Sequence, residues 1–472
     1  MIITYLCHKF FRMKRKRLSI SGLAVVIVAL LVLLIDNNLG LWKHENRIIV
    51  HDVYPFYGYL PATFIYHDLK LDYLDEFYAR GEYILWPKIT PEGNKVITAS
   101  MGMSMLYFPF FIPSHIYAVC SSFPADGYSP PYKFGLMISS AFFLILGLFF
   151  LRKLLLKYFS ETVTTIVLLV IPLATNILWY TVVESAMSHV YNFALISIFL
   201  YFTDLWHEKV TIKRTVIIGF LAGLITLIRP SNILVLLLFA LWDIKTLSEA
   251  WQRVLFFLHK WNHVVLMIIA FLLVWLPQFL YWKMQTGQYF YYSYPDDQGF
   301  FFGNPQIWNS LFSWRKGWLL YTPVMIFALA GIAILKKKHP KFFVPVLVYV
   351  LLNIYVISSW WDWWYGGGFG LRAYIDMYGI MAIPMAAALV WIFERGRKLK
   401  IALIIVFVLF TGRSIFHHLQ YHYGAIHWMA MTREAYFDSF FRIRPSENFQ
   451  NLIKNPDYEL ARKGIYKYEG ED

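Results

Sequence analysis

Long, uninterrupted runs of hydrophobic residues recur along most of the chain. A helix needs about 18 consecutive apolar residues to cross the hydrocarbon core of a bilayer. Eleven runs approach or exceed this length, and we predict a spanning helix in each: 18–36, 132–151, 162–182, 190–206, 215–229, 231–243, 262–283, 318–335, 342–359, 376–393 and 399–415. The runs are continuous rather than alternating, which favours helices over the strands of a membrane barrel. The pattern therefore predicts an all-α polytopic membrane protein.

The composition agrees with this class. Of the 472 residues, 58% are hydrophobic and 15% are charged, whereas about 25% are charged in a typical soluble domain. Basic cytoplasmic loops explain the formal net charge of +14, so we expect membrane lipids as partners and no nucleic acid. The basic N-terminus precedes an apolar run without a small-residue cleavage site, which favours an uncleaved first span. The two cysteines indicate no disulfide framework.

The distribution of lysine and arginine predicts the orientation of the spans. With the N-terminus in the cytoplasm, the six inner segments hold 23 of these residues, whereas the outer segments before the last span hold 9 over a much longer stretch. Such an excess is typical of cytoplasmic loops. The count requires 103–120 to lie in the outer interface, and 215–243 to form two short spans broken at Arg229-Pro230-Ser231. If either assignment fails, the later loops change sides.

The chain is thus predicted to have three parts. A basic cytoplasmic N-terminus covers 1–17, a transmembrane domain covers 18–415, and an outer, periplasmic C-terminal segment covers 416–472. The first outer loop, 37–131, is much longer than any other loop between spans and is expected to carry interfacial helices. The C-terminal segment is long enough to form a small cap over the same face. The polar chemistry of the protein is therefore expected outside.

The first outer loop concentrates acids and aromatic rings. Asp52 lies about sixteen residues beyond the first span, among tyrosines and prolines that would partly remove it from water, and a carboxylate in such a place can act as a general base. Asp68 and Tyr57 in the same loop are candidates for contact with a sugar. For Asp68 the favoured interpretation is an ordinary loop acid. Asp52 is therefore the candidate catalytic residue.

Glu184 and His189 lie together in VESAMSHVY, at the predicted outer mouth of two spans. Carboxylate and imidazole groups suit zinc or manganese. The chain has no close-spaced ligand pair of a recognisable kind, so a structural role and a metal-binding role are equally supported. We note a divalent metal at Glu184 and His189 as a candidate cofactor.

Few basic residues are expected on the outer face, so each is informative. Arg229, Arg315 and Arg372 are candidates for binding a phosphate, because a guanidinium can hold a phosphate with two parallel hydrogen bonds. Arg229 lies within an apolar hairpin, where a charge needs a partner. For Lys316, beside Arg315, we favour a side chain that extends to the lipid headgroups.

The stretch SSWWDWWYGGGFGLR, at 358–372, joins four tryptophans to three consecutive glycines. Tryptophan is common at membrane boundaries, but glycines allow the close approach of a ligand and an acid is unusual in such a belt. Aromatic faces can stack on sugar rings. We therefore predict a binding loop, with Trp361, Asp362, Trp364 and Tyr365 as candidate sugar contacts. The loop at 291–305 also combines aromatic rings, acids and glycines, but the argument that it binds a ligand is weaker.

The layout and several motifs resemble the GT-C superfamily of membrane glycosyltransferases, in particular the protein O-mannosyltransferase and aminoarabinose-transferase type. The likeness covers most of the chain in layout. Locally it depends on five motifs, which look like a bacterial branch: DVYPFYGYLPA from Asp52, ESAMSH from Glu184, GFLAGLITLIRP, PQFLYWKMQTGQ with LFSWRKGWLLYTP, and WWYGGGFGLR. Protein mannosyltransferases usually have Asp-Glu where this chain has Asp52-Val53, which leaves metal dependence and the acceptor open.

The resemblance implies an enzyme in a bacterial cytoplasmic (inner) membrane, with its site outside. The implied donor is a polyprenyl-phosphate-linked sugar rather than a nucleotide sugar, and the acceptor is a lipid, a glycan or a protein. In such enzymes the early aspartate of the first outer loop is the base or lies beside the reacting centre, and Asp52 matches it. Two other hypotheses stay open: a transporter or flippase of lipid-linked saccharides, and a non-catalytic membrane assembly subunit.

Overall fold

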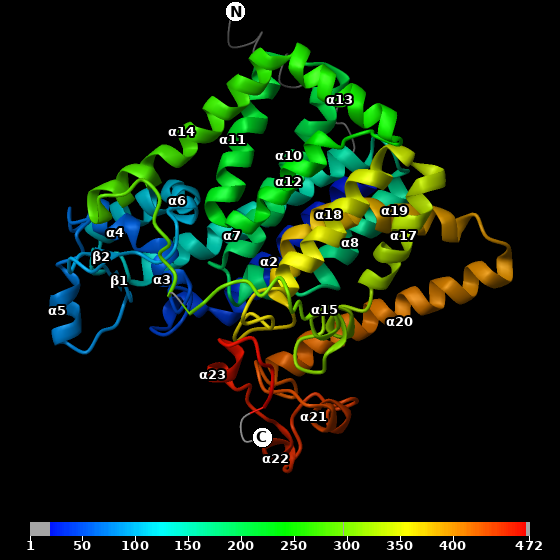
Figure 1. Ribbon diagram of the computed structural model, residues 1–472. Coiled ribbons are helices and arrows are strands. Elements are labelled where there is room, and N and C mark those ends of the chain that lie inside the picture. Colours follow the sequence, from blue (N-terminus) through cyan, green and yellow to red (C-terminus); the bar gives the residue numbers. More distant parts are fainter. Residues whose placement is uncertain (1–18, 296, 469–472) are drawn as a thin grey trace, which may run out of the picture.

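The computed structural model describes residues 19–295 and 297–468, and it is built almost entirely from helices (Figure 1). The predicted cytoplasmic N-terminus, 1–17, lies outside the described residues. The first half of the chain forms α2 (Ile20–Leu39), η1 (Leu41–Lys43), α3 (Val53–Tyr57), α4 (Tyr59–Phe64), α5 (Leu74–Ala79), β1 (Lys88–Ile89), β2 (Lys95–Val96), α6 (Gly102–Val119), α7 (Pro130–Leu155), α8 (Glu161–Leu173), α9 (Ile177–Val182), α10 (Ser188–Glu208) and α11 (Ile212–Ile228). The two strands pair antiparallel.

The second half continues the helical bundle and ends in a segment of short helices. It forms η2 (Pro230–Leu234), α12 (Val235–Ala240), α13 (Leu247–His259), α14 (Trp261–Thr286), α15 (Ile307–Phe312), α16 (Trp318–Tyr321), α17 (Met325–Lys338), α18 (Pro340–Ser358), η3 (Arg372–Met377), α19 (Tyr378–Phe393), α20 (Arg397–His422), α21 (Arg433–Asp438), α22 (Phe449–Leu452) and α23 (Tyr458–Ala461). In Figure 1, α13 lies at one end of the molecule and α21–α23 at the other.

Six helical stretches of the described chain are long and apolar enough to cross a membrane: Ile20–Lys43, Pro130–Leu155, Trp261–Thr286, Pro340–Ser358, Arg372–Phe393 and Arg397–His422. The other five predicted spans coincide with α8 and α9, α10, α11, α12, and α16 with α17, which are shorter, broken or more polar. The helical membrane class is therefore confirmed, whereas the count of eleven spans stays a prediction.

The break predicted at Arg229-Pro230-Ser231 coincides with the end of α11. Arg229 has extended backbone angles (φ −149°, ψ 103°), as expected for a residue before proline. A 3-10 turn follows, and the chain then enters α12. The helix α6 coincides with the segment 103–120, which the sequence analysis placed in the outer interface. This helix is continuous although it contains Pro109 and Pro113. It packs closely on α7, since a Cβ added to Gly135 would lie 2.2 Å from Ser114 Oγ.

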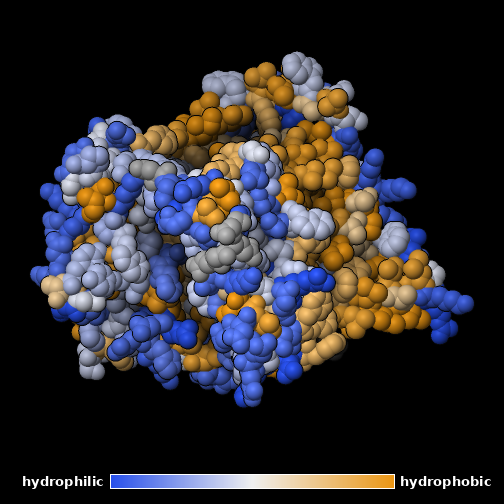
Figure 2. Space-filling model, turned by 60° about the horizontal axis from the view of Figure 1, so that its bottom comes forward, coloured by the Kyte–Doolittle hydropathy of each residue, from blue (hydrophilic) through white to orange (hydrophobic). Residues whose placement is uncertain are grey.

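Two long helices present apolar side chains to the outside of the bundle. On α14 these include Val265, Ile268, Leu272, Leu273 and Leu276, and on α20 they include Ile401, Ile405, Val408 and Leu409. In Figure 2, hydrophilic residues cover most of the face that carries the C-terminal segment, whereas hydrophobic residues occupy its upper and right edges. This division of the surface fits a bundle surrounded by lipid with a polar end.

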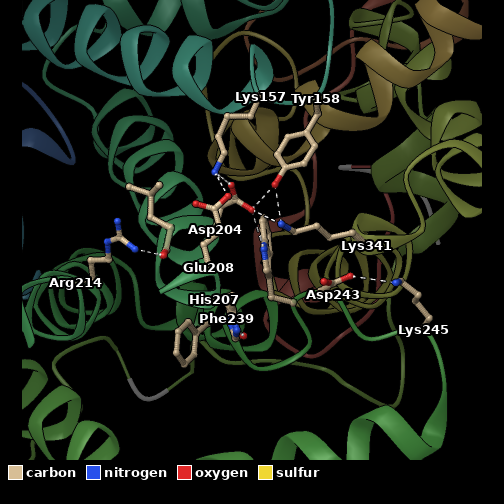
Figure 3. Close-up of polar contacts among 12 residues, drawn as sticks. Lys157, Tyr158, Asp204, His207, Glu208, Arg214, Phe239, Asp243, Lys245 and Lys341 are labelled. Atoms are coloured by element: carbon tan, nitrogen blue, oxygen red, sulfur yellow. Dashed lines mark hydrogen bonds and ion pairs between the residues drawn. The ribbon is translucent and has the colours of Figure 1, made fainter. Parts of the chain in front are cut away.

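A buried ion cluster joins several elements on the side away from the C-terminal segment (Figure 3). The side chain of Asp204, on α10, is fully buried and bonds to both Lys157 and Lys341. It also accepts hydrogen bonds from the Tyr158 hydroxyl at 2.7 Å and Trp242 Nε1 at 3.2 Å. Because a buried charge is costly without partners, Asp204 holds α10 and α18 together with the loop between α7 and α8 and the loop after α12.

The C-terminal segment packs on the glycine loop, which we define as residues 358–371 between α18 and η3. One cluster of buried side chains joins Trp361, Trp363 and Trp364 of the loop to Met429 and Ala461. The segment after α20 therefore covers the outer side of the aromatic residues of this loop.

Candidate active site

Two loops that the sequence singled out pair with each other at the polar end of the bundle. The amide of Phe301 donates to the Ser359 carbonyl at 2.6 Å, and the amide of Trp361 donates to the Gly299 carbonyl at 2.9 Å. The glycine loop then turns sharply. Gly366 and Gly368 have φ values of +61° and +140°, in a region that side chains with a Cβ disfavour.

Asp52 and Arg372 form an ion pair at the rim of this loop. The Arg372 Nη2 atom lies 2.8 Å from Asp52 Oδ2. The Asp52 side chain is 51% exposed, whereas that of Arg372 is 16% exposed. A Cβ added to Gly366 would lie 3.8 Å from Arg372 Nη2. The structure thus brings the candidate base, one candidate phosphate ligand and the glycines into one place, while their roles stay predictions.

The backbone around Asp52 orients its carboxylate. His51 has a φ of +47°, which is uncommon for a residue other than glycine. Asp52 then directly precedes the short helix α3, and its side chain makes no capping hydrogen bond to that helix. Because the helix does not use the carboxylate, the carboxylate is available to Arg372.

Lys316 is a site residue that the sequence analysis missed. Its side chain was expected to extend toward lipid headgroups, but Lys316 is only 2% exposed and Nζ donates to the Gly368 carbonyl. The expectation was wrong because the chain turns inward at Ser313–Gly317 and passes beneath the glycine loop. Burial, followed by repulsion from Arg372, lowers the pKa of Lys316 to about 7. The only sequence signal was its position beside Arg315.

Asp362 and Arg315 lie at the same loop. Burial raises the pKa of Asp362 to about 7, and attraction to Arg372 opposes that rise. Its Oδ1 atom has no hydrogen-bond partner among the described residues. The Arg315 guanidinium lies over the ring of Trp364, at 5.0 Å from its centroid, and over that of Tyr468, at 4.5 Å. The loop therefore has positive and negative groups whose charge changes near neutral pH.

Arg229 has the carboxylate partner that its apolar surroundings require. Its Nη1 atom lies 3.3 Å from Asp376 Oδ2, and its guanidinium lies over the Tyr365 ring at 5.3 Å. Asp376 also bonds to His189 Nδ1 at 3.1 Å and to Asn232 Nδ2 at 2.8 Å. Asp376 was missed, although an acid at the start of an apolar run was a visible signal. Arg229 is partly neutralised, which weakens its case as a phosphate ligand.

Glu184 and His189 bond to different partners in the protein. Glu184 Oε1 accepts a hydrogen bond from Trp179 Nε1 at 3.0 Å, whereas His189 bonds to Asp376. Burial raises the pKa of Glu184. Among the described residues, no group of three or more His, Cys, Asp or Glu side chains is placed to hold a metal ion. A metal at Glu184 and His189 therefore stays a prediction, and the proposed reaction does not depend on one.

Several predicted sugar contacts lie inside the protein. Tyr57 is fully buried and its hydroxyl donates to the Gly127 carbonyl at 2.6 Å, which places it in the core. Trp361 and Trp364 are also buried, because the C-terminal segment covers them. Asp68 accepts backbone hydrogen bonds from Lys70 and Tyr73 within its own loop, as the interpretation of an ordinary loop acid predicts.

No known protein family matches the chain, and no curated protein does. Among solved structures, it is similar to the archaeal oligosaccharyltransferase AglB from Archaeoglobus fulgidus, in complex with an inhibitory peptide and a dolichol-phosphate. The TM-score is 0.47 and the identity 12%, over 90% of this chain and 60% of that one. The chain thus spans about 60% of the length of AglB.

It is also similar to ArnT from Cupriavidus metallidurans bound to undecaprenyl phosphate. Here the TM-score is 0.48 and the identity 12%, over 84% of this chain and 70% of that one. Both neighbours are GT-C membrane glycosyltransferases.

Proposed function

We propose that this chain is an integral-membrane glycosyltransferase of GT-C type. It moves a sugar from a polyprenyl-phosphate donor to an acceptor on the outer face of the cytoplasmic membrane. The observation that carries the proposal is the ion pair between Asp52 and Arg372 at the rim of the glycine loop. An exposed carboxylate beside a guanidinium supplies the two groups that transfer from a lipid phosphate needs: a base and an anion ligand.

The reaction is a single displacement at the anomeric carbon, with inversion. Asp52 takes the proton of the acceptor hydroxyl or amide as the new bond to the anomeric carbon forms. The bond from that carbon to the phosphate oxygen breaks, and polyprenyl phosphate leaves with the electron pair. Arg372 balances the charge that develops on the leaving group. Lys316, where protonated, and Arg315 add positive charge beneath the glycine loop.

The ion pair sets the order of events. Arg372 cannot give both of its Nη groups fully to a phosphate while Nη2 stays on Asp52. Binding of the donor phosphate therefore releases the Asp52 carboxylate from its cation. A carboxylate without its cation is the stronger base, so donor binding prepares Asp52 for the acceptor.

The test is transfer by the purified protein in lipid nanodiscs. The donors are undecaprenyl-phosphate hexoses and pentoses with a radiolabelled sugar, presented with a bacterial envelope extract as acceptor. The proposal predicts release of undecaprenyl phosphate and label in the acceptor for the natural protein, and neither for Asp52→Asn. Asp72→Asn is the matched control, because Asp72 is an exposed acid of the same loop. Equal transfer by Asp52→Asn would remove Asp52 from the mechanism.

A second candidate function is a flippase for lipid-linked saccharides. It is favoured by the buried group of Arg229, Asp376 and His189, because transporters place ionisable residues inside the bundle. The same nanodisc protein, reconstituted into vesicles, distinguishes the two. Movement of the labelled donor between leaflets without transfer to an acceptor supports the flippase.

A further inference from the structure

A cleft of about 510 Å³ lies beside the glycine loop, which contacts its lining residue Trp428. It lies between the end of α2, the helix α9 and the C-terminal segment. The residues of its lining that matter for binding are Arg47, Trp179, Tyr421, His422, His427 and Trp428. The described lining includes one arginine and two histidines, and no acidic residue. The cleft is therefore aromatic and basic.

The glycine loop contacts both the ion pair and a wall of this cleft. Gly366 faces Arg372, and Gly367 packs against Trp428, since a Cβ added to Gly367 would lie 2.6 Å from Trp428 Cε3. The amide of Gly368 donates to the Trp428 carbonyl at 3.1 Å. Because these glycines have no side chains, the loop backbone approaches both Arg372 and Trp428 closely.

The aromatic walls of the cleft also contact residues of the ion-pair site. Trp179 donates its Nε1 proton to Glu184, a residue that lies close enough to Arg372 to feel its charge. Tyr421 meets Trp179 edge to face at 4.7 Å and stacks on Phe369 of the glycine loop at 4.8 Å. A ligand in the cleft is thus held against the back of the loop that presents Arg372.

The chemistry of the lining indicates the class of ligand. Trp428 is 49% exposed although it is tightly packed against Gly367, and such a fixed, open ring can stack on the apolar face of a sugar. Arg47 is exposed and lies five positions before Asp52. A guanidinium in a lining without acids favours a carboxylate or phosphate.

We propose that this cleft binds the acceptor, a saccharide that carries a carboxylate or phosphate group. The acceptor role depends on the transferase function proposed above, whereas saccharide binding itself does not. The ring of the sugar stacks on Trp428, and its anionic group pairs with Arg47. The reacting group of the acceptor then extends along the glycine loop toward Asp52.

The binding test uses full-length protein in phosphatidylcholine nanodiscs and ligand-observed NMR. The probes are a disaccharide that contains glucuronic acid, glucose 6-phosphate, and maltose as the neutral sugar. Trp428→Ala should weaken all three at least about tenfold, because it removes the stacking surface. Arg47→Gln should weaken the two anionic probes about tenfold and leave maltose unchanged. Trp308→Ala is the matched control, since Trp308 is 73% exposed and does not line the cleft.

Each result decides the proposal. The proposal is overturned if the natural protein binds none of the probes. It is also overturned if Trp428→Ala and Arg47→Gln bind the probes as tightly as the natural protein does. An anionic lipid headgroup is the other source of the same chemistry. If phosphatidylglycerol in the nanodisc displaces the acidic probes, the cleft is a lipid site and the saccharide proposal fails.

Transfer kinetics separate this proposal from the proposed function. Transfer with an unchanged acceptor KM in Trp428→Ala and Arg47→Gln would leave the transferase standing and remove the cleft from acceptor binding. Saccharide binding in a protein that transfers no sugar would leave the cleft and overturn the transferase.

Discussion

The Oδ2 atom of Asp52 lies 2.8 Å from the Nη2 atom of Arg372, although 320 positions separate the two residues in the chain. This contact joins the loop after α2 to the start of η3. It also means that each residue limits what the other can bind. A phosphate and the Asp52 carboxylate compete for the same guanidinium.

Asp52→Asn should have opposite effects on catalysis and on binding of the lipid product. Sugar transfer should fall by about 10²–10⁴-fold, because an amide cannot act as a general base. Binding of undecaprenyl phosphate should tighten several-fold, because the competing negative charge is gone. Native mass spectrometry in nanodiscs measures the affinity. Weaker binding by this variant would show that Asp52 does not compete with phosphate.

Arg372→Ala should weaken donor binding by about 10–150-fold, the range for a charge-assisted hydrogen bond of about 1.5–3 kcal/mol. The KM for the acceptor should change much less. Arg372→Lys keeps the charge but loses the planar fork, so it should recover only part of the affinity. Steady-state kinetics with each substrate varied in turn check this prediction, and equal losses for donor and acceptor would contradict a phosphate role.

Binding of the lipid phosphodiester should weaken as the pH rises through about 7. The pKa values of Lys316 and Asp362 are both displaced to about 7. As pH rises, Lys316 loses a positive charge and Asp362 gains a negative one, and both changes oppose an anion. The donor keeps one negative charge throughout. Affinity should therefore be highest below pH 7, and Lys316→Met should flatten the dependence; an unchanged pH profile in that variant would exclude Lys316 as its source.

Asp204→Ala should destabilise the protein by about 3–5 kcal/mol, because it leaves Lys157 and Lys341 partly buried without their shared carboxylate (Figure 3). Glu394→Ala is the control. It removes an exposed ion pair with Lys338, which is expected to contribute less than about 1 kcal/mol. Thermal unfolding in detergent, followed by intrinsic fluorescence, compares the two variants. Similar losses of stability in the two variants would mean that the buried cluster contributes no more than an exposed ion pair.

Gly367→Ala should displace the Trp428 ring, because the added Cβ would lie 2.6 Å from it. The expected cost is about 1–3 kcal/mol for an overpacked site, together with weaker saccharide binding in the cleft. Gly396→Ala is the matched control, since a Cβ there meets nothing within 4 Å. If saccharide affinity is the same in both variants, the contact between Gly367 and Trp428 does not shape the cleft.

The sequence predicted what depends on local composition. Apolar runs located the long helices α2, α7 and α14 closely and the first part of α20, because hydropathy marks the segments that can enter a bilayer. The chain break before Pro230 follows from the missing amide proton of proline. The shorter helices are less certain as spans, since their length and polarity are close to the limit.

Partners across the fold could not be predicted. Nothing near Lys316 in the sequence shows that it passes beneath Gly368, and nothing near Arg229 identifies Asp376 as its partner. Tyr57 lies in a stretch of sequence that is typical of a surface loop, yet its side chain is buried in the fold. Asp52 was identified because its loop resembles that of a known superfamily. Arg372 was identified because few basic residues are expected in the outer loops.

The glycine loop lies between an N-terminal loop on one face and the segment after the last long helix on the other. Gly368 donates to the carbonyl of Trp428, which follows α20 in the chain. A partly synthesised chain that has inserted its earlier helices still lacks this outer wall. The sugar transfer proposed above therefore requires that translation has passed α20 and that the tail has folded back onto the glycine loop.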